Sequence, residues 1–84
     1  MIATYDSEGD ILYITLDDVP VDHTDDVSRQ RQYERGIDYA ANGKLVGYEF
    51  MNASRGIDLE GLPHCAELAA VLRRTQSLYI AGPI

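Results

Sequence analysis

The sequence has few of the residues that crosslink or anchor a small protein. It contains one cysteine, Cys65, and no tryptophan among its 84 residues. A lone cysteine excludes a disulfide within the chain, and no apolar run approaches the ~18 residues that a membrane span needs. No positively charged leader precedes an apolar stretch, so we expect a cytoplasmic protein. A core of this size is marginal alone, which leaves a bound metal or a partner subunit as possible further support.

Basic residues are missing from the first third of the chain. Residues 1–28 contain eight carboxylates and no lysine or arginine, whereas the remaining 56 residues contain six carboxylates and seven bases. The formal net charge of −7 therefore originates in the N-terminal third. A field of that sign repels nucleic acid and anionic lipid and attracts basic partners. Solvation and protection of strand edges also explain charge runs, so this asymmetry alone does not define a site.

Two β-hairpins are expected. Residues 2–5 and 11–16 alternate as half-buried strands do, and the connection between them offers Asp6 as a backbone hydrogen-bond acceptor and Gly9 for the positive φ of a tight turn. A second pair of strands flanks Asn42-Gly43, the strongest short hairpin signal.

The register of the second hairpin follows from which pairing buries more apolar surface. A two-residue loop at Asn42-Gly43 pairs Tyr39 with Val46 and Ile37 with Tyr48, with Phe50 on the same face. Shifting by one residue would instead bring Glu49 onto that face, so we expect the first register.

The sequence predicts an α+β fold: an antiparallel β-meander of four or five strands with one C-terminal helix packed on one face. We expect a single domain over residues 1–84, divided into four parts: a β-sheet core over 1–55, a connector over 56–62, a helix over 63–76 and a tail over 77–84. Pro63 suits the first turn of that helix, and Arg73 and Arg74 suit its last turn. Between the hairpins, Pro20 excludes a central strand and indicates a long loop or irregular edge. The tail carries a short β-prone run, Leu78-Tyr79-Ile80-Ala81, that could pair with a sheet edge.

Both faces of the predicted sheet look apolar. Leu12 and Ile14 form one alternating set in the second strand and Ile11 and Tyr13 the other, while one helix can cover only one face. Six tyrosines add amphipathic contact residues. We therefore expect a homodimer.

Two segments of the chain resemble a known family. The segments "YDSEGDILYITLDDVPVDHTDDV" and "RGIDYAANGKLVGYEFMNAS" resemble the small bacterial and phage proteins catalogued as domain of unknown function 2283. The matching positions, within about residues 3 to 55, are Tyr5, Asp6, Glu8, Asp10, Leu12, Tyr13, Ile14, Pro20, Val21, Asp38, Tyr39, Gly43, Leu45, Val46, Gly47 and Glu49.

The resemblance implies a small β-rich module with no established activity, cofactor or catalytic residue. Placement of some members beside toxin-like genes suggests an antitoxin role. This chain departs from the family pattern in the longer link "SRQRQYER" and in its C-terminal helix and tail. A specialised function could reside in those additions.

Three patterns invite a metal or a catalytic interpretation, and none assembles the residues that it needs. Asp6, Glu8 and Asp10 match the first positions of a calcium loop, but the sixth position is Ile11 instead of glycine, which favours a hairpin corner. His23 lies among Asp22, Asp25 and Asp26, which could hold a divalent ion loosely. His64 and Cys65 are adjacent in a helix, so their side chains diverge, and we expect Cys65 to be a small core residue. We expect no enzyme, no cofactor and no metal site.

The remaining charged pattern is Arg29, Arg31 and Arg35, which would share one face of a strand with Tyr33. Such a face could grip phosphate, but we expect these arginines to satisfy the acidic N-terminal third, within the chain or across a dimer.

The function expected from these residues is a non-catalytic binding or regulatory module. Its acidic third would capture a basic protein partner, such as a toxin, through Asp17, Asp18, Asp22, Asp25 and Asp26. The alternative is a small-ligand or divalent-cation binding protein that uses the Asp17–Asp26 loop. No nucleic-acid or membrane partner is expected.

Overall fold

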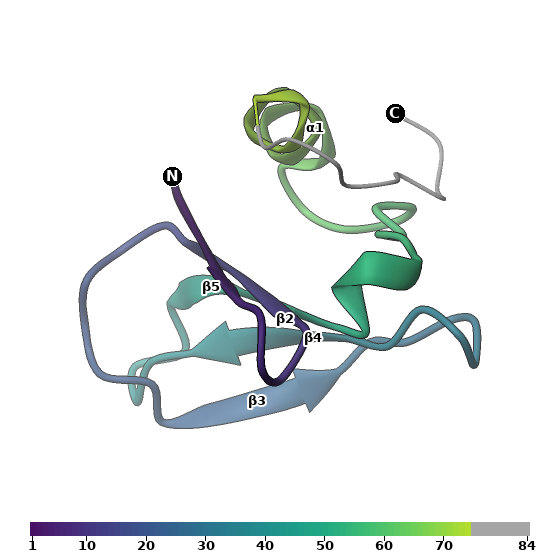
Figure 1. Cartoon of the computed structure of the whole chain (residues 1–84). Helices are drawn as coiled ribbons and strands as arrows, with labels where there is room; N and C mark the ends of the chain where they lie inside the picture. The colour runs from purple at the N-terminus through teal and green to yellow at the C-terminus, as the bar shows by residue number, and fades with distance from the viewer. Residues whose placement is uncertain (75–84) are drawn as a thin grey trace.

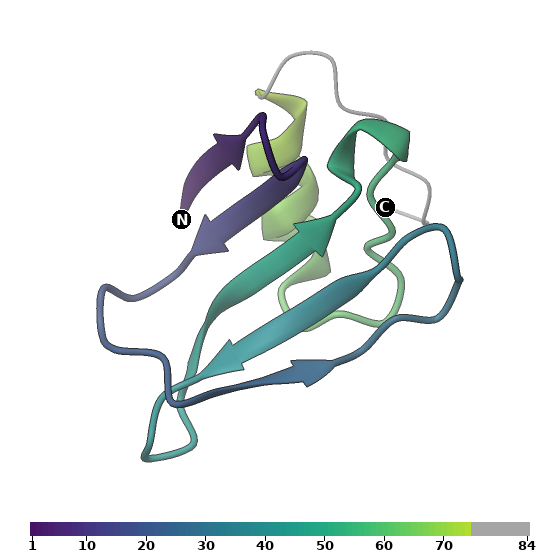
Figure 2. The same cartoon turned by 60° about the horizontal axis from the view of Figure 1, so that its bottom comes forward.

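The computed structural model describes residues 1–74 as a five-stranded antiparallel sheet with a helix across one face (Figures 1 and 2). The α+β class is therefore confirmed. The elements in chain order are β1 (Ile2–Asp6), β2 (Ile11–Thr15), β3 (His23–Asp26), β4 (Arg35–Tyr39), β5 (Leu45–Met51), the 3-10 helix η1 (Ala53–Arg55) and α1 (Cys65–Arg73).

The strand order is β1-β2-β5-β4-β3, which is not a simple meander. The segment after β2 carries the chain past β5 and β4 to the opposite edge, as Figure 2 shows. The physical reason lies in β3, whose sequence His-Thr-Asp-Asp is exposed at every position. A strand with no apolar face to bury belongs at an edge, and its charges protect that edge from further pairing.

The corner between β1 and β2 is held by two aspartates. Asp6 Oδ1 accepts hydrogen bonds from the backbone N–H groups of Glu8 at 3.0 Å and Gly9 at 3.3 Å, as its position predicts. The residue with positive φ is Asp10, at 54°, so the expectation for Gly9 is wrong. Asp10 tolerates this conformation because its side chain has local partners on Tyr5 and Ser54.

The second hairpin confirms one predicted pair and corrects another. Ile37 lies opposite Tyr48 as expected, but Tyr39 lies opposite Leu45, not Val46, because a bulge follows Asp38. The loop is longer than two residues: the Gly43 N–H donates to the Ala40 carbonyl at 2.9 Å, and Gly43 takes φ 84°. This is a type I turn closed by a glycine bulge, in place of a two-residue turn.

The core lies between the sheet and α1. Leu12, Ile14, Tyr48 and Phe50 point from β2 and β5 toward the helix, where they meet Leu68, Ala69, Leu72 and the connector residues Ile57, Leu59 and Leu62. The Tyr48 hydroxyl donates to the Pro63 carbonyl at 2.6 Å, which ties the start of the helix to the sheet.

The helix is shorter at its start than the 63–76 prediction. Pro63 precedes its N-cap, His64, whose φ of 60° turns the chain into the helix. Residues 75 and 76 and the predicted tail 77–84 lie outside the described residues.

The connector is anchored by a buried carboxylate. The Asp58 side chain is fully buried and accepts two hydrogen bonds from Arg29, at 3.0 and 3.1 Å, and one from the Glu60 N–H at 3.1 Å. Arg35, also buried, donates from Nη1 to the Asp58 carbonyl at 2.9 Å and from Nε to the Val27 carbonyl at 2.8 Å. Burial alone would raise the pKa of Asp58, but the hydrogen bond from Arg29 and the neighbouring charges hold it below its usual value.

These contacts correct the prediction for the arginines. Arg29 and Arg35 do not share a strand face, and their ion pairs join Asp58 and Glu60, which lie outside the acidic N-terminal third. Arg31 lines a shallow hollow with Asp26 and Glu34.

Candidate functional site

The face of the sheet away from the helix carries three rows of side chains that cross the strands. The first row contains, from β1 to β3, Thr4, Tyr13, Glu49, Gly36 and Asp26. The second contains Ile2, Thr15, Gly47, Asp38 and Thr24. The third row contains Asp6, Ile11 and Met51. Polar and glycine positions dominate the centre of the first two rows, whereas Ile11 and Met51 in the third row are apolar. This face is therefore mixed, and the expectation of an apolar face holds at Ile11 but not at the centre of the face.

A carboxyl pair occupies the centre of this face. Asp38 of β4 is only 8% exposed, and Glu49 of β5, which is half-buried, shares a hydrogen bond with it. Thr24 of the edge strand β3 donates from its hydroxyl to Asp38 Oδ1 at 2.6 Å and lies 3.3 Å from Glu49 Oε2. The pair thus joins three neighbouring strands.

The pair holds a proton near neutral pH. The hydrogen bond to Asp38, burial and the Asp38 charge together raise the pKa of Glu49 to about 7, and the hydrogen bond with Thr24 offsets this only in part. Two carboxyl groups this close cannot both ionise readily, because each negative charge disfavours the other. The site therefore gains a negative charge within the physiological pH range.

Two glycines complete the square around the pair. Asp38 and Glu49 lie on one diagonal of a two-by-two block, and Gly36 and Gly47 lie on the other. A Cβ on Gly47 would overlap the Ile14 carbonyl oxygen, and a Cβ on Gly36 would come within 2.8 Å of the Thr24 methyl. Side chains at these positions would displace backbone or the threonine that binds Asp38, so the block needs both glycines.

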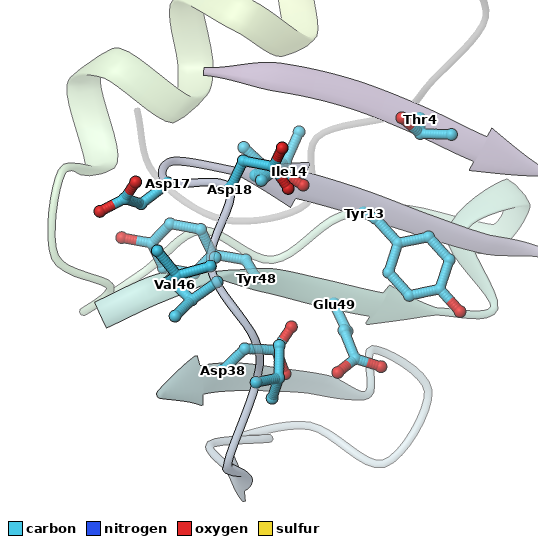
Figure 3. A pocket seen from close by; sticks show the side chains of 13 residues that line it. Thr4, Tyr13, Ile14, Asp17, Asp18, Asp38, Val46, Tyr48 and Glu49 are labelled. Carbon is cyan, nitrogen blue, oxygen red and sulfur yellow. The ribbon is translucent and has the colours of Figure 1, made fainter. Parts of the chain in front are cut away.

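A pocket of about 500 Å³ opens over this block (Figure 3). Its floor includes Tyr13, Glu49 and Asp38, and Tyr13 lies directly opposite Glu49 in the β2–β5 pairing. Residues 17–21, which link β2 to β3, form one wall with Asp17, Asp18, Val19 and Val21. The volume falls within the range of small-ligand sites.

The structure divides the five predicted partner-binding residues between two places. Asp17 and Asp18 line the pocket, and Asp17 forms an ion pair with Lys44 at 2.7 Å, which lowers the pKa of that aspartate. The other three lie along the β3 edge. Asp22 is exposed beside His23, with a 2.9 Å contact to its Nδ1, Asp25 is exposed, and Asp26 accepts a hydrogen bond from the Ser28 N–H at 2.9 Å.

The metal interpretations gain no support from this arrangement. Within residues 1–74 no group of three or more histidine, cysteine, aspartate or glutamate side chains is placed to hold a metal ion. Asp6 and Asp10 are engaged in the hairpin corner: Asp10 accepts from the Tyr5 hydroxyl at 2.7 Å and from the Ser54 hydroxyl at 2.6 Å. His23 stacks on Tyr39 with ring centroids 5.3 Å apart.

The His64-Cys65 pair is not arranged as a nucleophile and base. The His64 ring lies 3.6 Å from the Glu67 carboxylate on the exposed side of the helix start. The Cys65 thiol is half-buried and donates to the Leu59 carbonyl at 3.3 Å. Cys65 packs against the core, as expected.

Sequence reasoning missed Asp38 and Glu49 as site residues. The signal was available in strand parity: once Ile37 pairs with Tyr48, Asp38 and Glu49 must share the face that the helix does not cover. What parity could not show was the wall formed by residues 17–21, because a loop that crosses a sheet has no periodic pattern.

The face, its carboxyl pair and its two glycines lie inside the segment that a family model matches. Residues 3–54 match the family described as protein of unknown function DUF2283, and this chain belongs to that family. No curated protein and no solved structure matches this sequence. Across the described residues, no helix has the length and apolar character that crossing a membrane requires.

Proposed function

We propose that this protein is a non-catalytic binding module of the cytoplasm that captures a basic polypeptide, such as a protein toxin, through its acidic N-terminal third. The observation that carries the proposal is that, among the described residues, lysine and arginine neutralise little of the negative charge of this acidic third. Among residues 1–74, Lys44 is the one lysine or arginine that forms an ion pair with a carboxylate of residues 1–28. Of the three arginines that follow the acidic third most closely in sequence, Arg29 and Arg35 form ion pairs with Asp58 and Glu60, and Arg31 lines a hollow with Asp26 and Glu34.

The position of these carboxylates favours a polypeptide partner. Asp22, Asp25 and Asp26 lie exposed along or beside the edge strand β3, and Asp17 and Asp18 lie at the wall of the pocket. An extended row of like charges attracts a chain that carries several opposite charges, and it does so with a strong dependence on salt.

The test compares the wild type with the triple variant Asp22→Asn, Asp25→Asn, Asp26→Asn. The probe is a ten-residue lysine peptide, with a ten-residue glutamate peptide as the control, and affinity is measured by calorimetry at low and high salt. We expect the lysine peptide alone to bind, with an affinity that falls at high salt and in the triple variant. An affinity for the lysine peptide that the triple substitution leaves unchanged would overturn the proposal.

Affinity capture from the native cell lysate then identifies the partner. The wild type and the triple variant serve as paired baits, and mass spectrometry compares what each retains. The partner is expected to be a basic protein retained by the wild type and lost by the variant.

A small-ligand site is the second candidate function, because Asp17, Asp18, Val19 and Val21 wall a pocket. This candidate differs from the first in its salt dependence, since a ligand enclosed by apolar and polar contacts is less sensitive to screening.

A homodimer also remains a proposal, with a changed argument. The centre of the sheet face away from the helix is polar, but β1 lies at an edge of the sheet, where Ile2 is 69% and Tyr5 44% exposed. Exposed apolar residues on an edge strand favour pairing with a second strand. Light scattering after size-exclusion chromatography at micromolar concentration tests this, and a strictly monomeric mass would contradict it.

A further inference from the structure

We propose that the pocket over the sheet binds one organic cation, the ammonium or guanidinium group of a lysine or arginine side chain of the basic partner, between the Asp38–Glu49 carboxyl pair and the ring of Tyr13. This inference rests on the proposed function and specifies where a single side chain of the partner would enter.

The cavity is the first support. A volume of about 500 Å³ can admit an extended side chain together with part of its backbone. Its wall contains Val19 and Val21, which are 38% and 50% exposed and offer apolar surface to the methylene groups of a lysine or arginine stem. Its floor is polar, with the carboxyl pair at the centre. A long side chain with a charged end and an apolar stem fits this division.

The chemistry of the floor is the second support. Thr24 supplies one hydroxyl donor to Asp38, so the pair has more acceptor capacity than the described residues satisfy with donors. An ammonium offers three donors and a guanidinium five, with no acceptor. A cation would therefore satisfy both carboxylates at once and replace the proton that they share.

The aromatic ring on the floor of the pocket favours an organic cation. Tyr13 pairs directly with Glu49 across β2 and β5, so its ring lies beside the carboxyl pair (Figure 3). A cation near an aromatic face gains attraction from the ring quadrupole, and this favours ammonium and guanidinium groups that carry apolar stems. The absence of a three-ligand metal group within residues 1–74 points away from a divalent ion as the occupant.

The charges around the pair determine how binding depends on pH. Glu49 is faced by three groups: Asp38 from β4, Tyr13 from β2 and the hydroxyl of Thr24 from β3. Asp17 and Asp18 face the pocket from the 17–21 segment. Lys44 remains paired with Asp17. Because the pKa of Glu49 is about 7, the cation must compete with a proton at acidic pH. Affinity should fall about tenfold from pH 8 to pH 6, as the ionised fraction of Glu49 falls about tenfold.

The test uses the full chain labelled with ¹⁵N and two cationic probes, butylammonium and N-acetyl-lysine methylamide, with butanol and N-acetyl-norleucine methylamide as neutral controls. Amide shifts are recorded at pH 8 and pH 6 at an ionic strength of about 0.15 M. We expect the cationic probes to shift amide resonances of β2 and β5 near Tyr13 and Glu49. The probes should bind more tightly at pH 8 than at pH 6. Equal shifts with the neutral probes would overturn the inference.

Variants separate the pocket from general charge. Glu49→Gln should weaken the cationic probes at least tenfold at pH 8 and remove the pH dependence. Glu8→Gln makes the same change of charge outside the pocket and should leave the affinity unchanged. Tyr13→Leu keeps both carboxylates and should weaken binding about threefold, in line with a partly exposed cation–π contact. Binding that Glu49→Gln and Tyr13→Leu both leave unaltered would contradict the pocket assignment.

The lysine peptide distinguishes failure of this inference from failure of the proposed function. If its binding depends on Asp22, Asp25 and Asp26 but not on Glu49, the acidic third captures the partner and the pocket assignment is wrong. If the small cations bind through Glu49 but the peptide does not bind, the partner assignment is wrong and the pocket serves a free organic amine.

Discussion

Asp38 and Glu49 lie diagonally across two neighbouring strands, with Gly36 and Gly47 filling the other diagonal of the same block. This relationship lets the two carboxyl groups approach each other, because the glycines contribute no side chains to the block. Their mutual repulsion contributes to the raised pKa of Glu49, about 7, and the Thr24 hydroxyl lies 2.6 Å from Asp38 Oδ1 and 3.3 Å from Glu49 Oε2. The folded protein therefore contains a group whose ionisation costs stability.

The first prediction concerns stability against pH. The folded-state pKa of Glu49, about 7, lies above the ordinary value of 4.5, so the folded state holds an extra proton between these values and its stability falls as pH rises through them. We expect the free energy of unfolding of the wild type to fall by about 1–2 kcal/mol from pH 5 to pH 8, after allowance for the partial exposure of this carboxyl. Glu49→Gln should not show this fall. Urea unfolding at both pH values measures this. A parallel pH profile for wild type and variant would contradict the assignment, and Glu8→Gln supplies the control.

The second prediction concerns the buried Asp58. Asp58→Asn removes the carboxylate that pairs with Arg35 and leaves Arg29 with Glu60 alone, and we expect a loss of about 2–4 kcal/mol, because the buried Arg35 charge is then uncompensated. Glu60→Gln changes a carboxylate that is 47% exposed in the same cluster and should cost under about 1 kcal/mol. Equal losses in the two variants would show that the buried Asp58 carboxylate contributes no more to stability than the exposed Glu60 carboxylate.

The third prediction concerns the effect of acid on the stability that Asp58 provides. Its folded-state pKa is lowered, so the stabilisation is present at neutral pH and is lost as the pH falls from about 4 downward through that folded-state value. The wild type should lose stability in this range more steeply than Asp58→Asn, as measured by urea unfolding at pH 5 and pH 3.

The fourth prediction tests the requirement for glycine at position 47. A methyl group on Gly47 would overlap the carbonyl oxygen of Ile14, which is backbone and cannot rotate away, so we expect Gly47→Ala to cost about 3 kcal/mol. Gly43→Ala is the contrasting control, since its Cβ meets nothing within 4 Å. That control should cost only about 1 kcal/mol, through its φ of 84°. Thermal unfolding by circular dichroism should rank the two variants in this order, and a reversed order would contradict the close strand approach.

The fifth prediction concerns Tyr48, which joins the sheet to the start of the helix. Tyr48→Phe removes the hydrogen bond to the Pro63 carbonyl and should cost about 1 kcal/mol, because that carbonyl is left with one fewer donor. Burial, reinforced by nearby charges, raises the pKa of Tyr48 to about 12. Ultraviolet titration of the wild type should therefore show a tyrosine that ionises near pH 12 and is missing from the variant.

Local patterns predicted the local structures well, and the errors have physical causes. The Asp6 corner, the Ile37–Tyr48 pair and the core role of Cys65 follow from turn chemistry, parity and helical periodicity. The meander was wrong because strand order depends on pairings distant in sequence, and the acidic strand β3 reaches its edge through a loop without periodicity. The arginines were misassigned because a distant aspartate, Asp58, offers a buried site that no charge count along the chain reveals.

The pairing of β2 with β5 has a consequence for synthesis of the chain. Strand β2 can pair with β5, its second neighbour, only after Met51 has left the ribosome. Until then β1 and β2 form an isolated two-stranded hairpin, which is marginal in water. Leu12 and Ile14, whose side chains pack on α1, remain uncovered until α1 has been translated as well. Folding during synthesis therefore ends with contacts between segments distant in sequence, and the first hairpin is the segment for which a nascent-chain chaperone would compete.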